Sequence, residues 1–243
     1  MPRSTRGKVA PVLLTVDSLE VHWGHVHAVR GVSFEIARGE TLGLVGESGC
    51  GKSSLARALV QLVKPSKGSV RFEDPKRKLQ LVFQDPKAAL DPRLTVQATL
   101  EEPLEIAGLE LKRVPALLDA VGLGAELLPR RPHELSAGQR QRINIARALA
   151  VEPTLLVLDE PVSALDVSVQ AQVLNLLVEL QKSRGLTYLF ISHDLAVVSH
   201  IATRIAVMQE GRIVELGPAE QVIVTPQHAY TKTLLDAAAR LAL

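Results

Sequence analysis

A glycine-rich run that ends in lysine and serine, Gly46–Ser53 (GESGCGKS), has residue types and a spacing suited to holding phosphates. Glycines let the backbone turn its N–H groups toward an anion, and the N-terminus of a following helix adds a favourable dipole. Lys52 is expected to reach the β- and γ-phosphates, and the Ser53 hydroxyl is expected to bind Mg²⁺. The alternative is a chance glycine-rich turn. The pattern predicts binding of a nucleoside triphosphate.

The elements on either side of this run have the character that a phosphate loop requires. Residues Thr41–Val45 form a short apolar segment, typical of a buried strand. Residues Ser53–Val63 place Leu55, Leu59 and Leu62 at helical spacing. The run therefore lies between a predicted strand and a predicted helix.

A second chemically competent segment is Leu155–Leu158, an apolar strand that ends in Asp159 and Glu160. The carboxyl end of a buried strand faces the crevice in which α/β folds bind ligands. Asp159 is expected to orient the Mg²⁺ shell. Glu160 is expected to polarise a water molecule, a general-base role worth about 10²–10⁴ in rate. The alternative is a polar strand end followed by a turn at Pro161.

Residues Leu135–Gln139 precede a helix expected over about 140–150. A hydroxyl residue and a glycine at a helix start can bind an anion, although they also make an ordinary N-cap. Their position twenty residues before Asp159 favours a binding role.

The rest of the chain alternates strands and helices, which predicts an α/β fold. Residues from Asp85 to about Pro132 contain short helical stretches broken by prolines, and we expect an inserted helical subdomain there. The other expected elements are strands at 12–22, 31–36, 69–73, 79–83 and 187–192, a turn at 65–68, a helix through 169–180 that Gly185 ends, and a hairpin over 205–215 around Glu210-Gly211.

Composition restricts the class of protein. The 243 residues are 47% hydrophobic and 22% charged, an ordinary globular balance, and the net charge of +2 does not predict nucleic-acid binding. One cysteine excludes an internal disulfide and offers no zinc or cluster site. No apolar run approaches the length of a membrane span. Arg3, Arg6 and Lys8 predict a flexible basic tail over 1–10.

The motifs occur in the order Gly46–Ser53, Gln84, Leu135–Gln139, Asp159-Glu160, Ser163–Asp166 and His193. In this order they resemble the motifs of the nucleotide-binding subunits of ABC transporters, and the resemblance covers about residues 12–240. The resemblance implies a P-loop NTPase of ABC type, with a RecA-like core and an antiparallel β subdomain. It implies one ABC ATPase domain over 11–243, with the helical subdomain inserted at about 85–150.

The resemblance also implies a role for each matching residue. Catalysis is expected to involve Glu160, His193, Gln84 and Lys52, and Mg²⁺ is expected at Ser53, Gln84 and Asp159. The residues expected at ATP are Trp23, Gly46, Glu47, Ser48, Gly49, Cys50, Gly51, Lys52, Ser53 and Ser54. Trp23, the only tryptophan, is expected to stack on adenine; the alternative is a strand residue packed for its area.

Two further motifs are expected to act between subunits. Ser136, Gly138 and Gln139 match the family signature and would contact the ATP of a facing subunit, while Ser163 and Asp166 match the D-loop. Ala137 stands where the family usually has the first signature glycine. A methyl group is tolerated there if φ is negative, so we expect function to be retained.

A narrower resemblance, to the peptide/nickel importer branch, is carried by residues 84–86, 89–96, 163–174 and 226–231. It implies an ATPase that powers uptake of peptides, nickel or metal–chelator complexes. The implied partners are a second ATPase chain, two membrane permeases and an extracytoplasmic binding protein, with no direct nucleic acid. The implied location is the cytoplasmic face of the membrane. The alternatives are an ABC ATPase that acts on ribosomes or DNA, and a catalytically silent partner subunit.

Overall fold

The structure, a computed structural model, describes residues 10–74 and 79–241, so nearly all of the expected basic tail over 1–10 lies outside the described residues. Within them, a six-stranded sheet has the order β5-β6-β7-β3-β8-β9, parallel except for β9. Its strands are β3 (Thr41–Val45), β5 (Leu79–Val82), β6 (Leu155–Asp159), β7 (Thr187–Ser192), β8 (Arg204–Gln209) and β9 (Arg212–Pro218). The predicted α/β class is confirmed.

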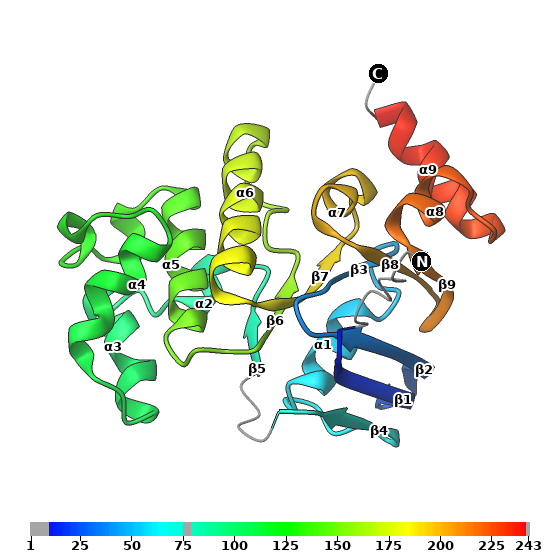
Figure 1. Ribbon diagram of the computed structural model, residues 1–243, viewed down its shortest axis with the longest axis horizontal. Coiled ribbons are helices and arrows are strands. Elements are labelled where there is room, and N and C mark those ends of the chain that lie inside the picture. The colour runs from blue at the N-terminus through cyan, green and yellow to red at the C-terminus, as the bar shows by residue number, and fades with distance from the viewer. Residues whose placement is uncertain (1–9, 75–78, 242–243) are drawn as a thin grey trace, which may run out of the picture.

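A separate antiparallel sheet has the order β2-β1-β4. Its strands are β1 (Val12–Trp23), β2 (Val26–Ala37) and β4 (Lys67–Phe72). It lies at the lower right in Figure 1, next to α1 (Lys52–Leu59). The chain reaches the phosphate-loop segment directly from this sheet, because β2 precedes β3.

The two faces of the parallel sheet belong to different hydrophobic clusters, as the alternation of side chains along a strand requires. Leu155 and Val157 pack in a cluster that also contains residues of β1, β2 and α1. Leu156 and Leu158 pack in a cluster that contains residues of the helices on the other face. All four side chains are fully buried, so the carboxylates that follow stand at the end of a rigid strand.

A group of helices lies between β5 and β6 in the chain and at the left in Figure 1. It contains α2 (Pro86–Ala89), α3 (Val96–Ile106), α4 (Val114–Ala120), α5 (Ala137–Leu149) and 3₁₀ turns at Leu111–Arg113, Ala125–Leu127 and Pro132–Glu134. The remaining helices are α6 (Val167–Arg184), α7 (Leu195–Ile201), α8 (Ala219–Val224) and α9 (Ala229–Leu241). In the part of the chain that the structure describes, no helix combines the length and apolar character needed to cross a bilayer.

Several boundaries differ from those predicted. α1 ends at Leu59 instead of Val63, because the chain turns at Gln61, where φ is 63°. β2 begins at Val26 instead of Gly31, since a tight turn at Gly24, with φ of 57°, leads straight out of β1. β4 begins at Lys67, within the predicted turn, and α5 begins three residues before Arg140. The hairpin around Glu210-Gly211 and the C-cap at Gly185 are confirmed.

Candidate functional site

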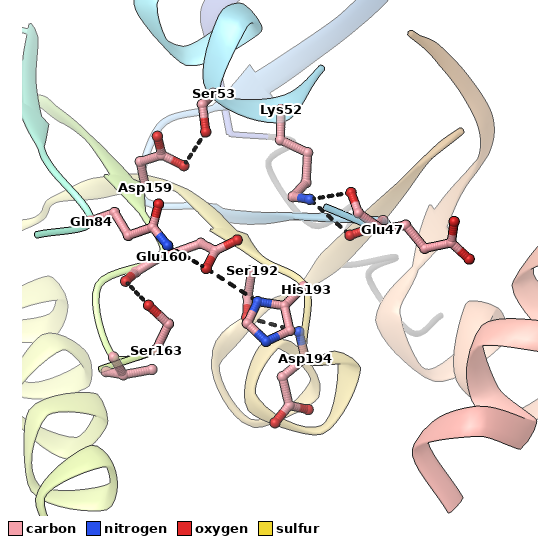
Figure 2. A network of polar contacts seen from close by, with 12 residues as sticks. Glu47, Lys52, Ser53, Gln84, Asp159, Glu160, Ser163, Ser192, His193 and Asp194 are labelled. Atoms are coloured by element: carbon pink, nitrogen blue, oxygen red, sulfur yellow. Dashed lines mark hydrogen bonds and ion pairs between the residues drawn. The ribbon is translucent and has the colours of Figure 1, made fainter. Parts of the chain in front are cut away.

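The glycine-rich segment joins β3 to α1 and wraps around its own lysine. The Lys52 ammonium group donates hydrogen bonds to the carbonyl oxygens of Gly46 and Glu47, both at 2.8 Å (Figure 2). The lysine side chain is buried, so its charge lies inside the loop and is not exposed on the surface. Residues 46–52 therefore form a compact loop around a positive charge, at the N-terminus of a helix.

Gly51 shows why this loop needs glycine. Its φ of 111° is in the region that L side chains rarely adopt, and a Cβ atom there would lie 2.2 Å from the carbonyl oxygen of Ala28. The loop backbone is thus pressed against β2. Any side chain at this position would push the two segments apart.

A second glycine connects the loop to both sheets by backbone bonds. The Gly211 N–H donates to the Cys50 carbonyl at 2.9 Å, and the Gly211 carbonyl accepts the Arg30 N–H at 2.8 Å. Glu210 and Gly211 have φ values of 45° and 81°, as the two central residues of a type I′ hairpin turn do. The β8–β9 turn thereby holds the loop against β2.

Asp159 and Ser53 meet beside the loop. Asp159 ends β6, and its Oδ1 accepts a hydrogen bond from the Ser53 hydroxyl at 3.2 Å (Figure 2). Burial raises the pKa of the Asp159 carboxyl group, and the neighbouring Glu160 acts in the same direction. A carboxylate and a hydroxyl are the oxygen donors that Mg²⁺ prefers, so this pair fits the ion that the sequence predicts.

Glu160 is held by two side chains that come from other strands. Its Oε2 accepts a hydrogen bond from Gln84 Nε2 at 3.0 Å and lies 3.1 Å from His193 Nδ1 (Figure 2). Gln84 follows β5 and His193 follows β7, so the two strands that flank β6 both contribute. Glu160 has a φ of 49°, uncommon for a residue with a side chain and typical of a constrained site.

Short polar contacts hold the segments around Glu160. Its N–H donates to the Ile191 carbonyl at 2.9 Å, which ties the end of β6 to β7. Ser163, expected in the D-loop, donates its hydroxyl to the Glu160 carbonyl at 3.2 Å. Asp194 caps α7 by accepting the Ala196 N–H at 2.8 Å, which keeps His193 at the end of β7.

A cavity of about 900 Å³ lies over these groups, within the size range of ligand sites. Trp23 stands at its edge, 45% exposed, and donates its indole N–H to the Ser54 hydroxyl at 3.1 Å. The predicted site residues that line the cavity are Trp23, Glu47, Ser48, Gly49, Cys50, Gly51, Lys52, Ser53, Ser54, Gln84, Glu160 and His193. The ends of β5, β6 and β7, the loop and Trp23 thus meet at one cavity.

The signature residues are placed elsewhere. In the part of the chain that the structure describes, Ser136, Gly138 and Gln139 are not among the residues lining the cavity. Ser136 accepts the Gln139 N–H at 3.2 Å while Gln139 Oε1 accepts the Ser136 N–H at 2.9 Å, a complete capping box at the start of α5. Ala137 opens α5 and has no positive φ, so its methyl group is accommodated as predicted.

Asp166 also lies at a helix start. It caps α6 by accepting the Val169 N–H at 3.0 Å. Gly138 faces the same turn, because a Cβ atom on it would lie 2.6 Å from Val169 Cγ1. The signature and the D-loop motif are therefore packed against each other through the first turn of α6.

One contact at the loop has no counterpart in the sequence-based predictions. The Glu47 N–H donates to the hydroxyl of Tyr230 at 3.1 Å, and Leu234, one helical turn further along α9, lines the cavity. Glu215 holds the segment that leads into α9 by accepting the N–H groups of Gln227 and His228 at 2.9 and 3.0 Å. Tyr230 lies in the branch motif at 226–231, but the motif does not predict this contact, because 183 residues separate its two partners.

Comparison with known proteins supports one family. A family model described as ABC transporter matches residues 29–163. The chain is 50% identical to the oligopeptide transport ATP-binding protein OppF of Bacillus subtilis (strain 168), over 93% of this chain and 82% of that protein. It is 54% identical to the probable D,D-dipeptide transport ATP-binding protein DdpF of Escherichia coli (strain K12), over 87% of this chain and 70% of that protein.

A solved structure agrees with these relatives. The ATP-binding cassette MJ0796, in a dimeric post-hydrolysis state bound to ADP and Pi, superposes with a TM-score of 0.75 at 28% identity, over 85% of this chain and 99% of that one. The predicted P-loop NTPase fold of ABC type is confirmed. By its family match, its relatives and its fold, the chain belongs to the ABC transporter family, as an ATPase subunit.

Proposed function

We propose that this chain hydrolyses ATP to power the uptake of peptides through membrane permeases. The observation that carries the proposal is the convergence of Gln84 and His193 on one oxygen of Glu160, beside a loop that encloses Lys52. The peptide cargo is supported by the relatives, whose names state oligopeptide and D,D-dipeptide transport. Of the expected cargoes, these names support peptides and do not mention nickel.

The loop and Trp23 are the proposed ATP site. The N–H groups of residues 46–54 would surround the phosphates, and Lys52 would exchange its bonds to the Gly46 and Glu47 carbonyls for bonds to phosphate oxygens. The indole of Trp23 would stack on the adenine, since its exposed ring borders the cavity.

Ser53 and Asp159, which share a hydrogen bond, and Gln84 would together hold Mg²⁺. The ion, when bound, would neutralise charge on the phosphate oxygens. Glu160 would accept a proton from the attacking water. His193 would hold the γ-phosphate through its ring, and its contact with Glu160 at 3.1 Å keeps the two groups aligned. Gln84 would orient the water and report the state of the site to the membrane partners.

The signature is proposed to act on a facing subunit. Ser136 and Gly138 stand at the start of α5, away from the cavity of their own chain. A hydroxyl that already accepts the Gln139 N–H can still donate its proton to a γ-phosphate. Two chains paired head to tail would bring each signature over the other's loop, with Ser163 and Asp166 between them. The dimeric relative MJ0796 supports such pairing.

Membership in this family supports a wider assembly. We propose one ABC ATPase domain over residues 11–243, with the segment at about 85–150 as its helical subdomain. The partners would be a second ATPase chain, two permeases and an extracytoplasmic binding protein, with this chain on the cytoplasmic face of the membrane. An ABC ATPase that acts on ribosomes or DNA is the alternative, and the transport relatives speak against it.

The test is purification of the native complex through a tag on this chain, after gentle extraction in detergent, with identification of the co-purifying proteins by mass spectrometry. Permeases together with a second ATPase would support the importer. Recovery with ribosomal or DNA-repair proteins and without a permease would overturn it, while leaving the ATPase chemistry intact.

A further inference from the structure

Two histidines and a glutamate gather on the outer face of the antiparallel sheet, near the tip of the β1–β2 hairpin. Glu20 and His22 are two residues apart on β1, and His27 is the cross-strand partner of His22 on β2. Candidate ligand atoms of the three side chains lie within 4.8 Å of one another. Neighbours at positions i, i+2 and directly across the strand pair share one face of a sheet.

The Ser66 hydroxyl lies between His22 and the backbone of Glu20. It donates to the Glu20 carbonyl at 3.0 Å and lies 2.8 Å from His22 Nδ1. In the tautomer with its proton on Nδ1, His22 donates to this hydroxyl and has a lone pair on Nε2. Histidines that bind metals are oriented in this way, with the second ring nitrogen donating to a protein oxygen.

The Nε2 atom of His27 faces the Glu20 carboxylate. It is buried and makes no hydrogen bond within the described residues, and Glu20 Oε2 lies 3.5 Å away, at ion-pair distance. Buried polar atoms usually have a hydrogen-bond partner, so a ligand shared with Glu20 would satisfy this nitrogen better than the long contact does. The rings of His22 and His27 are stacked, with centroids 3.9 Å apart and an interplanar angle of 19°. This stacking holds the two imidazoles side by side next to the Glu20 carboxylate.

We propose that Glu20, His22 and His27 bind a divalent transition-metal ion of the Zn²⁺, Ni²⁺ or Cu²⁺ class. Two imidazoles and one carboxylate are an established ligand set for such ions, and water would complete the coordination. The competing cation is Lys67, whose ammonium group lies 3.5 Å from Glu20 Oε2; its side chain is 73% exposed and can swing into solvent. The bound ion would join β1 to β2 one residue before Trp23, at the edge of the ATP cavity.

Trp23 provides a direct readout, because it is the only tryptophan and is adjacent to His22. Titration of the full chain with NiCl₂, in a buffer containing Mg²⁺, should quench its fluorescence and saturate at one equivalent. Addition of ZnCl₂, which does not quench, should displace Ni²⁺ and restore the signal. ZnCl₂ should also raise the melting temperature, as any ligand of the native state does.

The variants decide which residues hold the ion. His27→Ala and Glu20→Gln should each weaken Ni²⁺ binding by about tenfold or more, and Lys67→Gln should strengthen it. His25→Ala is the matched control, because His25 lies on the same hairpin outside the cluster and should leave binding unchanged. Glu20→Gln keeps the side-chain size and serves if His27→Ala does not fold. The proposal would be overturned if Ni²⁺ quenching survived unchanged in His27→Ala and Glu20→Gln. It would also be overturned if His25→Ala lost the quenching to the same extent as those two variants.

Discussion

The hydroxyl of Tyr230 lies 3.1 Å from the backbone nitrogen of Glu47 and accepts its hydrogen bond, so the C-terminal helix holds the second residue of the phosphate loop. This contact connects segments that are 183 residues apart in the chain. It also places the start of α9 in direct contact with the loop, so a change in the loop conformation would be transmitted to this helix. The segment at 226–231, which resembles the importer branch, therefore has a structural role at the proposed ATP site.

Removal of this hydroxyl in Tyr230→Phe should weaken ATP binding about fivefold, the equivalent of one hydrogen bond worth about 1 kcal/mol. The reason is that a less restrained loop must lose more conformational freedom when it binds phosphates. Binding of a fluorescent ATP analogue measures the effect.

Tyr188→Phe is the matched control. Its hydroxyl is buried and donates to the Leu177 carbonyl at 2.9 Å, away from the loop. This variant should lower the free energy of unfolding by about 1 kcal/mol and leave ATP affinity unchanged. Equal ATP affinity in Tyr230→Phe and the wild type would show that the contact does not support the loop.

Glu160→Gln should lower the rate of ATP hydrolysis by about 10²–10⁴ and leave ATP binding intact, because the amide cannot accept a proton from water. His193→Ala should also slow hydrolysis, since Glu160 loses a partner at 3.1 Å. Residues that act as one unit are not additive, so the double variant should be no slower than Glu160→Gln alone. Steady-state phosphate release measures the rates. If the rate reductions of the two single variants multiplied in the double variant, Glu160 and His193 would act independently, contrary to this prediction.

Trp23→Ala should weaken ATP binding by about tenfold or more, whereas Trp23→Phe should retain most of the affinity, because stacking on a base is worth about 1–3 kcal/mol. The predicted pattern is a loss of affinity without a loss of stability, since the ring is half exposed. Isothermal titration with ATP and thermal unfolding together test it. A variant that unfolds more easily but binds ATP normally would favour a packing role for Trp23.

Cys50 predicts a pH dependence. Burial raises the pKa of its thiol, and the nearby Lys52, 3.9 Å from Sγ, offsets this only in part. The reactive thiolate is therefore scarcer at neutral pH in the folded chain than in the unfolded one. Alkylation by iodoacetamide should be slow at pH 7 and should accelerate at a higher pH in the native protein than in urea. ATP should slow it further, because Cys50 lines the cavity. Identical pH profiles in both states would contradict the shift.

The parts of the site predicted from sequence are those in which function is concentrated in contiguous residues. The loop at 46–53, the strand end at Asp159 and the histidine after β7 each carry their own local signal, an apolar strand followed by polar groups. A strand of a parallel sheet is buried on both faces, so its sequence is easily recognised. The order of such strands then determines that their ends meet.

Contacts between segments that are far apart in the sequence have no such local signal. The start of β2 was missed because its first residues, Val26 to Arg30, mix apolar and charged types, and because one glycine makes the preceding turn very short. The Tyr230 contact depends on where α9 packs, a property of the whole fold. The His22–His27 pair becomes visible only once the strand register is known.

The Gly211 bonds have a consequence for how the family can diversify. Main-chain hydrogen bonds of Gly211 join the phosphate loop, the β8–β9 turn and β2, so substitutions that preserve the turn and the loop glycines leave these bonds in place. The segment leading into the helical group instead reaches Glu160 through the side-chain amide of Gln84, so one substitution removes this bond. Substitutions in this family can therefore alter the connection between Glu160 and the helical group while the main-chain bonds of the loop persist.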